Sequence, residues 1–165
     1  MKHLFLLAIV FGISATTIAQ NKLGGHFGMV HPLITFSDGE TTSISDNYVV
    51  GFPTGINIGI KENLAFDVEI VPFIEDGKMN NLLFHPGVLF GLGSGFTFGN
   101  RLAFETGSQA YGFTPLLNKS FSLGENGAFF LELVLPVRFG KIELPLGGED
   151  RFSALTVGLH TGIAF

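Results

Sequence analysis

Eight residues that could carry a charge or move a proton occupy alternate positions in strongly apolar stretches: Asp67, Glu69, His85, Arg101, Glu105, Glu132, Arg138 and His160. Such a set could line a path for protons or ions, or supply an acid and a base for catalysis. It could also form ion pairs that fill an interior too narrow to conduct. The set contains four carboxylates and only two arginines, so we expect some of the carboxylates to pair with histidine. We favour an ion-paired interior.

Metal-dependent and nucleophilic chemistry have little support in the remaining residues. The histidines at positions 3, 26, 31, 85 and 160 show no metal-ligand spacing, and the chain has no cysteine. We therefore expect no metal site, no disulfide and no cofactor. His31 with Ser37, or His85 with Ser45, are the nearest approach to a base and a nucleophile, and no spacing supports either pair. We predict that the protein is not an enzyme.

The elements that position these side chains are indicated by a period of two in the apolar residues, which is the period of a β-strand. In the stretch LAFDVEIVPFI (64–74), large apolar residues alternate with Ala65, Asp67 and Glu69. The pattern predicts eight strands, at about 23–36, 48–60, 64–74, 82–98, 101–109, 114–123, 128–143 and 152–165. Tight turns are expected at 61–63, 99–100 and 124–127, and longer polar loops at 37–47, 75–81 and 144–151. Short turns that alternate with longer loops are typical of a barrel with two different rims.

Composition indicates what surrounds these strands. The mean hydropathy is +0.44, yet after the first twenty residues no apolar run is long enough for a transmembrane helix. One face of each strand carries Phe, Leu and Ile, whereas the other carries mainly Gly, Ala and isolated charges. Small residues suit the crowded inside of a narrow barrel, and the apolar face suits lipid. The sequence therefore predicts an all-β fold, a closed antiparallel transmembrane β-barrel.

The first residues have the layout of a secretory signal peptide. Lys2 precedes an apolar run from Leu4 to Ile13, and small residues at Thr17 and Ala19 precede Gln20. We predict a cleaved signal peptide over residues 1–19 and a single barrel domain over 20–165. Removing the basic Lys2 takes the formal net charge from −5 to −6, which argues against nucleic acid as a partner.

A signal peptide ending TIAQ, eight amphipathic strands and a last strand LTVGLHTGIAF resemble the OmpA/OmpX-like family of small outer-membrane β-barrel proteins. The resemblance implies residence in the outer membrane of a Gram-negative envelope, in contact with its lipid. It also implies that the last strand is read by the outer-membrane assembly machinery, through Leu159, Thr161, Ile163 and Phe165. One departure concerns the aromatic belts: the chain has no Trp and only Tyr48 and Tyr111, so Phe must form most of each belt.

Several functions are compatible with this architecture. We expect a structural or surface-interaction role for a monomeric barrel whose interior is filled by side chains and a polar network. A ligand-binding barrel, either in the membrane or soluble and lipocalin-like, is the main alternative. A lipid A-modifying enzyme and a narrow channel are the others.

Overall fold

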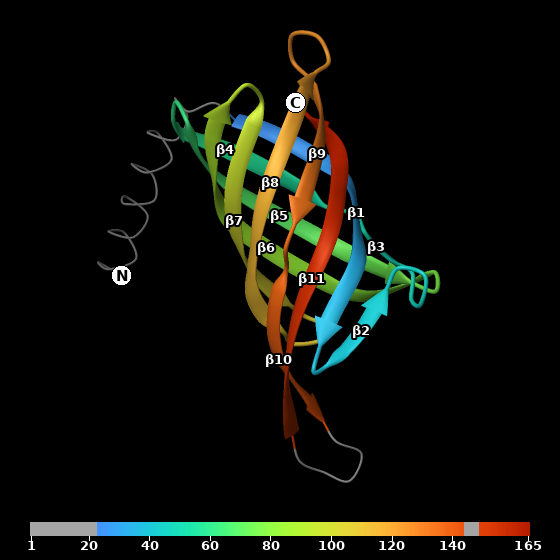
Figure 1. Ribbon diagram of the computed structural model, residues 1–165. Helices are drawn as coiled ribbons and strands as arrows, with labels where there is room; N and C mark the ends of the chain where they lie inside the picture. Colours follow the sequence, from blue (N-terminus) through green and yellow to red (C-terminus); the bar gives the residue numbers. More distant parts are fainter. Residues whose placement is uncertain (1–22, 144–148) are drawn as a thin grey trace, which may run out of the picture.

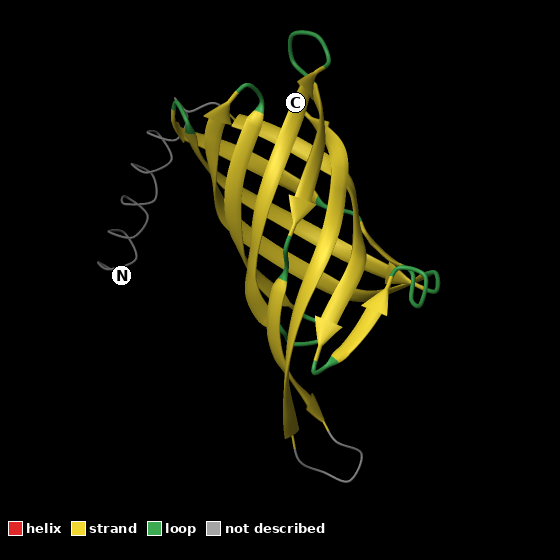
Figure 2. Cartoon of the chain, in the orientation of Figure 1, coloured by secondary structure: helices red, strands yellow, loops and turns green. Residues whose placement is uncertain are grey.

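The computed structural model describes residues 23–143 and 149–165, so the predicted signal peptide and most of the predicted 144–151 loop lie outside the described residues. The strands in chain order are β1 (Leu23–Ser37), β2 (Glu40–Ser43), β3 (Val49–Gly51), β4 (Thr54–Lys61), β5 (Leu64–Glu75), β6 (Lys78–Gly93), β7 (Phe96–Glu105), β8 (Tyr111–Ser122), β9 (Ala128–Val134), β10 (Val137–Glu143) and β11 (Glu149–Ala164). All pair antiparallel with their neighbours, and Figure 2 shows the resulting all-β structure.

The strands form a closed ring, because the first and last strands pair with each other (Figure 1). Their register runs from His26 opposite Ala164 to Ser37 opposite Ala154. Beyond this ladder, the backbones of Gly25 and Phe165 exchange two hydrogen bonds of 2.7 and 2.9 Å. Closure leaves no open edge in the ring that residues 23–143 and 149–165 form, as a barrel in lipid requires.

The described residues form eleven strands, but the wall of the barrel has eight positions around the ring, here called staves, and some staves consist of two strands in succession. β3 and β4 are two parts of one stave interrupted at Phe52–Pro53, and β9 and β10 are two parts of another interrupted at Leu135–Pro136. Proline has no N–H for the ladder, which explains both interruptions. The short strand β2 extends a loop and pairs with β1 only. The predicted fold, a closed antiparallel barrel of eight strands, is confirmed.

Two predicted connections are wrong. Positions 99–100 are not a turn: β7 runs through them, and the turn lies at 94–95, where Ser94 and Gly95 have positive φ angles of 51° and 77°. Gly99 is needed instead for packing, because a Cβ there would stand 2.5 Å from Leu89 Cδ2. The predicted loop 75–81 is a tight hairpin in which Asp76 and Gly77 have φ of 50° and 72°. Positive φ at both positions is characteristic of a type I′ turn.

The two rims of the barrel differ. One, here called the terminus rim, holds the turns at 62–63, 94–95 and 123–127 together with Leu23 and Phe165. The other, here called the loop rim, holds the connections at 38–48, 76–77 and 106–110 and the projecting β10–β11 hairpin. The loop rim is where the sequence predicted the longer loops, although its connection at 76–77 is a tight turn.

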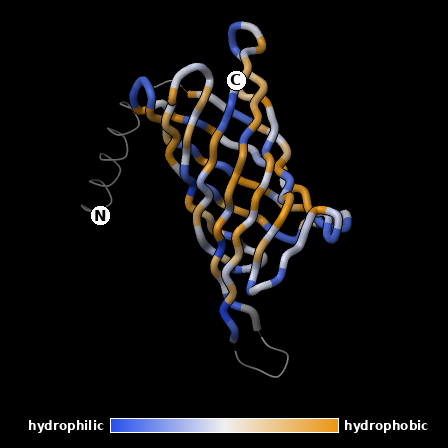
Figure 3. The backbone as a smooth tube through the Cα atoms, viewed as in Figure 1, coloured by the Kyte–Doolittle hydropathy of each residue, from blue (hydrophilic) through white to orange (hydrophobic). Residues whose placement is uncertain are grey.

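The side chains are sorted inversely to those of a water-soluble protein. Large apolar residues such as Phe27, Phe66, Phe98 and Leu131 are exposed on the outside, and hydrophobic positions extend around the barrel wall (Figure 3). The buried residues include many polar and charged ones. An apolar outer band with a polar interior is the arrangement of a barrel that spans a bilayer, and it disfavours a soluble lipocalin-like barrel. No helix of the described residues is long and apolar enough to cross a membrane.

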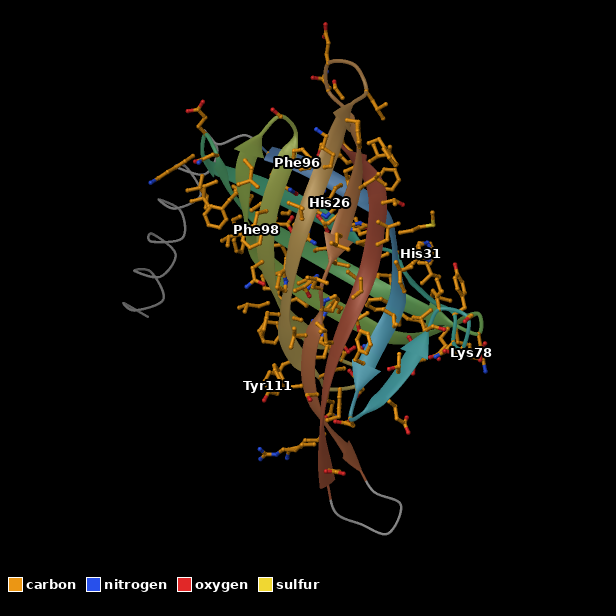
Figure 4. All side chains as sticks on the ribbon, viewed as in Figure 1. His26, His31, Lys78, Phe96, Phe98 and Tyr111 are labelled. Atoms are coloured by element: carbon orange, nitrogen blue, oxygen red, sulfur yellow. The ribbon has the colours of Figure 1, made fainter. Side chains whose placement is uncertain are left out.

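The aromatic belts are divided by residue type. Both tyrosines lie at the loop rim. Tyr48 comes just before β3, and Tyr111 begins β8, where Figure 4 labels it. At the terminus rim, the Lys119 ammonium lies 4.4 Å from the centre of the Phe96 ring and 5.6 Å from that of Phe121. A lysine that reaches along phenylalanine rings toward water supplies the polar end that phenylalanine lacks.

Candidate functional site

The charged centre of the barrel is built around Arg101 of β7. Its Nε donates to Asp67 Oδ2 at 2.5 Å and its Nη1 donates to Glu132 Oε1 at 2.9 Å. Its Nη2 lies 3.6 Å from Glu69 Oε2. Asp67 and Glu69 come from β5 and Glu132 from β9, so one guanidinium joins carboxylates from different sides of the ring. All four side chains are buried, which strengthens their mutual attraction.

Three histidines surround this centre and bond its carboxylates. His26 Nε2 lies 3.1 Å from Glu69 Oε2, and His85 Nδ1 lies 3.1 Å from Glu69 Oε1. His160 Nδ1 lies 3.0 Å from Glu132 Oε1. Each histidine belongs to a different strand, β1, β6 or β11. The expectation that histidine joins the excess carboxylates agrees with these contacts.

A second ion pair lies closer to the loop rim. Arg138 Nε of β10 donates to Glu105 Oε1 at 2.7 Å, and Glu105 also accepts from Asn81 Nδ2 at 2.6 Å. Thr114 connects this pair to the charged centre: its hydroxyl accepts from Arg138 Nη1 at 3.1 Å and lies 2.9 Å from His85 Nε2. Since Arg138 is always a donor, the hydroxyl proton of Thr114 is free to point to His85.

The interior between and below these groups is largely filled. Val71, Leu83 and Ala103 form a buried apolar cluster, with Val30 and Phe73 packed against it. The cavity bounded by this cluster, Glu69 and Arg138 measures about 40 Å³, room for very few water molecules. A cavity of about 110 Å³ lies on the other side of Arg101, lined by Asn57, Asn118 and Ser120. A larger hollow of about 580 Å³, lined by residues that include Asn57, Leu89 and Thr97, lies at the terminus rim. At the level of the ion pairs, the two small volumes suit a filled interior better than an open pore.

Glycines make room for the large polar side chains. A Cβ on Gly55 would contact His26 Cε1 and stand 2.7 Å from both His26 Nε2 and Val68 O. A Cβ on Gly87 would stand 2.7 Å from Cα and Cγ of Arg101. The glycine-rich inward face of the strands is therefore part of the polar network, because it leaves the space that the network occupies.

Gly55→Ala should displace the His26 ring and lower the free energy of unfolding by about 1–3 kcal/mol, the usual cost of overpacking. Gly91→Ala is the matched control, because its Cβ would meet nothing nearer than 3.8 Å. Urea unfolding in lipid vesicles, followed by mobility on a gel without boiling, measures both variants. Equal stability of the two variants would contradict the close packing at Gly55.

The structure places all eight residues of the predicted interior network inside the barrel, in the contacts described above. The sequence analysis missed His26, Asn57 and Thr114, which bond the network. The alternation of residues could have placed His26 in the interior, because His26 lies in the phase opposite to the outward-facing Phe27 and Met29. Thr114 and Asn57 are neutral and give no comparable signal.

The two candidate catalytic pairs are not brought together. His31 and Ser37 are six residues apart on β1, which is about 20 Å along an extended strand. His85 bonds Glu69 and Thr114 inside the barrel, whereas the Ser45 hydroxyl contacts that of Ser43 in the 38–48 loop. Among the described residues, no group of three His, Cys, Asp or Glu side chains could hold a metal ion.

The 38–48 loop is held by its own hydrogen bonds. Asp46 accepts from the Ser43 hydroxyl at 2.7 Å and from the Ser43 backbone amide at 2.8 Å. These bonds favour the carboxylate and keep the pKa of Asp46 below its usual value. Asn47 Nδ2 donates to Glu75 Oε1 at 2.5 Å and ties the end of the loop to the β5–β6 hairpin. The loop rim thus presents an ordered, acidic surface.

The residues of the proposed assembly signal follow the outward phase of β11. Leu159 and Phe165 are exposed, and Thr161 and Ile163 are partly exposed. His160, between Leu159 and Thr161, is buried and bonds Glu132. The last strand therefore alternates between the outer surface and the polar network.

The ring of eight staves, the apolar outer band and the ion-paired interior define a small transmembrane β-barrel. Comparison with solved structures agrees: the solid-state NMR structure of outer membrane protein AlkL in DMPC lipid bilayers matches with a TM-score of 0.52 and 11% sequence identity, covering 88% of this chain and 90% of that one. At this identity the likeness shows the fold alone. The fold is that of a small outer-membrane β-barrel, as the sequence predicted.

Two further structures match less well. The crystal structure of the outer membrane protein OprG from Pseudomonas aeruginosa has a TM-score of 0.48 at 10% identity, covering 86% of this chain and 93% of that one. A de novo designed transmembrane β-barrel has a TM-score of 0.42 at 13% identity, covering 86% and 97%. No protein-family model and no curated protein matches the sequence.

Proposed function

We propose that this protein is a monomeric, integral outer-membrane barrel that acts at its external surface and does not conduct, transport or catalyse through its interior. The observation that carries the proposal is the pair of ion-paired layers across the interior, Arg101 with Asp67 and Glu132, and Arg138 with Glu105. Eight strands leave an interior only wide enough for side chains. Charged groups that pair with one another there fill the interior and leave the loops to meet partners.

The proposal includes an orientation and two kinds of contact. The loop rim faces outward from the cell and the terminus rim faces the periplasm, as short turns and longer loops are arranged in barrels of this kind. Outer-membrane lipid surrounds the apolar band. The last strand, through Leu159, Thr161, Ile163 and Phe165, is the contact for the assembly machinery.

Wild-type protein in planar lipid bilayers should show no discrete conductance steps, because the ion pairs and the apolar cluster at Val71 and Leu83 close the interior. Folding is verified on the same sample by faster gel mobility without boiling. A matched preparation of a known porin supplies the positive control. Reproducible cation-selective openings that change in Glu105→Gln would overturn the closed interior and favour a channel.

A further inference from the structure

His26 differs from the other two histidines of the charged centre in the atoms that face its second ring nitrogen. Its Nε2 lies 3.1 Å from Glu69 Oε2, and its Nδ1 lies 3.0 Å from Asn57 Oδ1. Nδ1 is also 3.9 Å from a carboxylate oxygen, Asp67 Oδ1. A neutral imidazole donates from one nitrogen only, whereas an imidazolium donates from both. Oxygen acceptors at both nitrogens therefore favour the doubly protonated, positively charged ring.

The other two histidines have surroundings that suit a neutral ring. His85 Nδ1 lies 3.1 Å from Glu69 Oε1, and its Nε2 lies 2.9 Å from the hydroxyl of Thr114, which can donate its proton to it. His160 Nδ1 lies 3.0 Å from Glu132 Oε1, and its Nε2 is buried without a hydrogen-bond partner among the described residues. A proton on that nitrogen would be a buried donor without an acceptor, which is costly.

The charges around His26 favour a further cation at this position. The titratable and charged groups that face its ring are Asp67 and Glu69 on β5, Arg101 on β7, Glu132 on β9 and His160 on β11, whose ring centre lies 6.4 Å away. Three buried carboxylates thus stand against one guanidinium, and buried charges need compensation. Asp67 Oδ1 has no hydrogen-bond partner among the described residues. An imidazolium at His26 would place a positive charge beside this oxygen.

A route for protons leads to His26 from the terminus rim. Figure 4 shows His26 in the half of the barrel nearer that rim. His26 lines the cavity of about 110 Å³ next to Arg101. This cavity shares Asn57, Leu89 and Thr97 with the hollow of about 580 Å³ at the rim, so the two adjoin. Toward the loop rim, the buried apolar cluster described above closes the interior.

We propose that His26 is the proton-binding site of the charged centre: its ring holds both protons at neutral pH and exchanges them with water at the terminus rim. The ring donates from Nε2 to Glu69 and from Nδ1 to Asn57, and its charge compensates Asp67. The stabilisation is present while the ring is charged and is lost as the pH rises and the ring becomes neutral. The proposal goes beyond the surface role proposed above and does not depend on it.

Nitrogen-15 NMR of the histidine side chains in the folded full chain tests the charge, because the imidazolium and the neutral tautomers are protonated at different nitrogens. At pH 8 a histidine in water favours the neutral form by about 30-fold. Wild type should still show one histidine with both nitrogens protonated at this pH, and His26→Gln should remove its signal. His160→Gln, the matched buried control, should leave that signal unchanged.

Asn57→Leu provides a second test that keeps the histidine. It removes the oxygen that accepts from Nδ1, so the ring should become neutral at a lower pH than in the wild type. If His26→Gln does not fold, this shift still assigns the charged signal to His26. The proposal is overturned if the wild type shows no doubly protonated histidine at pH 7, or if the charged signal responds neither to His26→Gln nor to Asn57→Leu.

The route from the terminus rim has its own test. The chain has no cysteine, so Thr97→Cys supplies a single thiol where the cavity and the hollow adjoin. A bulky maleimide attached there should slow hydrogen–deuterium exchange of the His26 ring protons. The same label on Ser45→Cys, which is exposed at the loop rim, should not. Equal exchange rates with both labels would overturn the route. Conductance in planar bilayers tests the closed interior separately.

Discussion

Replacing Arg101 with alanine should lower the free energy of unfolding by about 3–5 kcal/mol, the cost of breaking a buried ion pair by removing one partner. The guanidinium is the shared partner of Asp67, Glu69 and Glu132, which come within 2.5, 3.6 and 2.9 Å of it. Without it, the three carboxylates remain buried next to one another and only the histidines partly compensate. Urea unfolding in vesicles, read by gel mobility, measures the loss.

Two controls separate the ion pairs from general packing. Lys61→Ala removes a charge from an exposed position at the terminus rim, and we expect a change within about 0.5 kcal/mol. The double variant Arg101→Ala with Glu132→Ala should recover part of the loss, because one unpaired carboxylate is removed together with the arginine. Additive effects in this double-mutant cycle would reject the coupling.

Acidification provides an independent readout of the same hypothesis. Protonated carboxylic acids need no counter-charge, so the stability gap between wild type and Arg101→Ala should shrink as the pH is lowered far enough to protonate them. A cavity left by the shortened side chain would instead cost the same at every pH. A gap that does not change with pH would therefore assign the role of Arg101 to packing and not to charge.

The strands were predictable because, along each of them, apolar residues that face outward alternate with small or polar residues that face the interior. Asp67 and Glu69 alternate with the apolar residues of β5, and this alone places them in the interior. The contact of Arg101 with Glu132 was not predictable, because the two residues are 31 positions apart and belong to strands separated by β8. Which side chains meet across a barrel depends on the tilt of the strands and on their stagger, and neither quantity can be derived from a single sequence.

The wrong turn at 99–100 has a physical explanation. Glycine serves tight turns and also positions where another group approaches the backbone closely. The sequence shows glycines at 93, 95 and 99 in one run. The first two adopt positive φ in the turn, whereas Gly99 lies under the Leu89 and Leu116 side chains. Only the packing of neighbouring strands distinguishes the two uses.

Leu159→Lys should destabilise the barrel by about 2–4 kcal/mol, the cost of a lysine on the lipid face at mid-bilayer, and should reduce the amount of assembled protein. Leu159 is 37% exposed and lies opposite His31 of β1, in the middle of that ladder, and opposite Leu133 of β9 on its other side. Ile163→Lys is closer to the terminus rim and should cost less, since the penalty falls toward the interface. Thr42→Lys, in the exposed strand β2, should cost little. Equal tolerance at Leu159 and Thr42 would reject the assignment of the apolar face to lipid.

The matched variant Leu133→Lys separates the cost of lipid exposure from recognition by the assembly machinery. Leu133 is 44% exposed and lies directly opposite Leu159 in the register, but it belongs to β9 and not to the last strand. Purified Leu133→Lys and Leu159→Lys should therefore refold into vesicles with similar losses of stability, because both place a lysine at the same depth. In cells, Leu159→Lys should assemble less well than Leu133→Lys if the last strand is the contact for the assembly machinery. Equal assembly in cells would remove the recognition role from Leu159 and leave it a lipid-facing residue like its neighbour on β9.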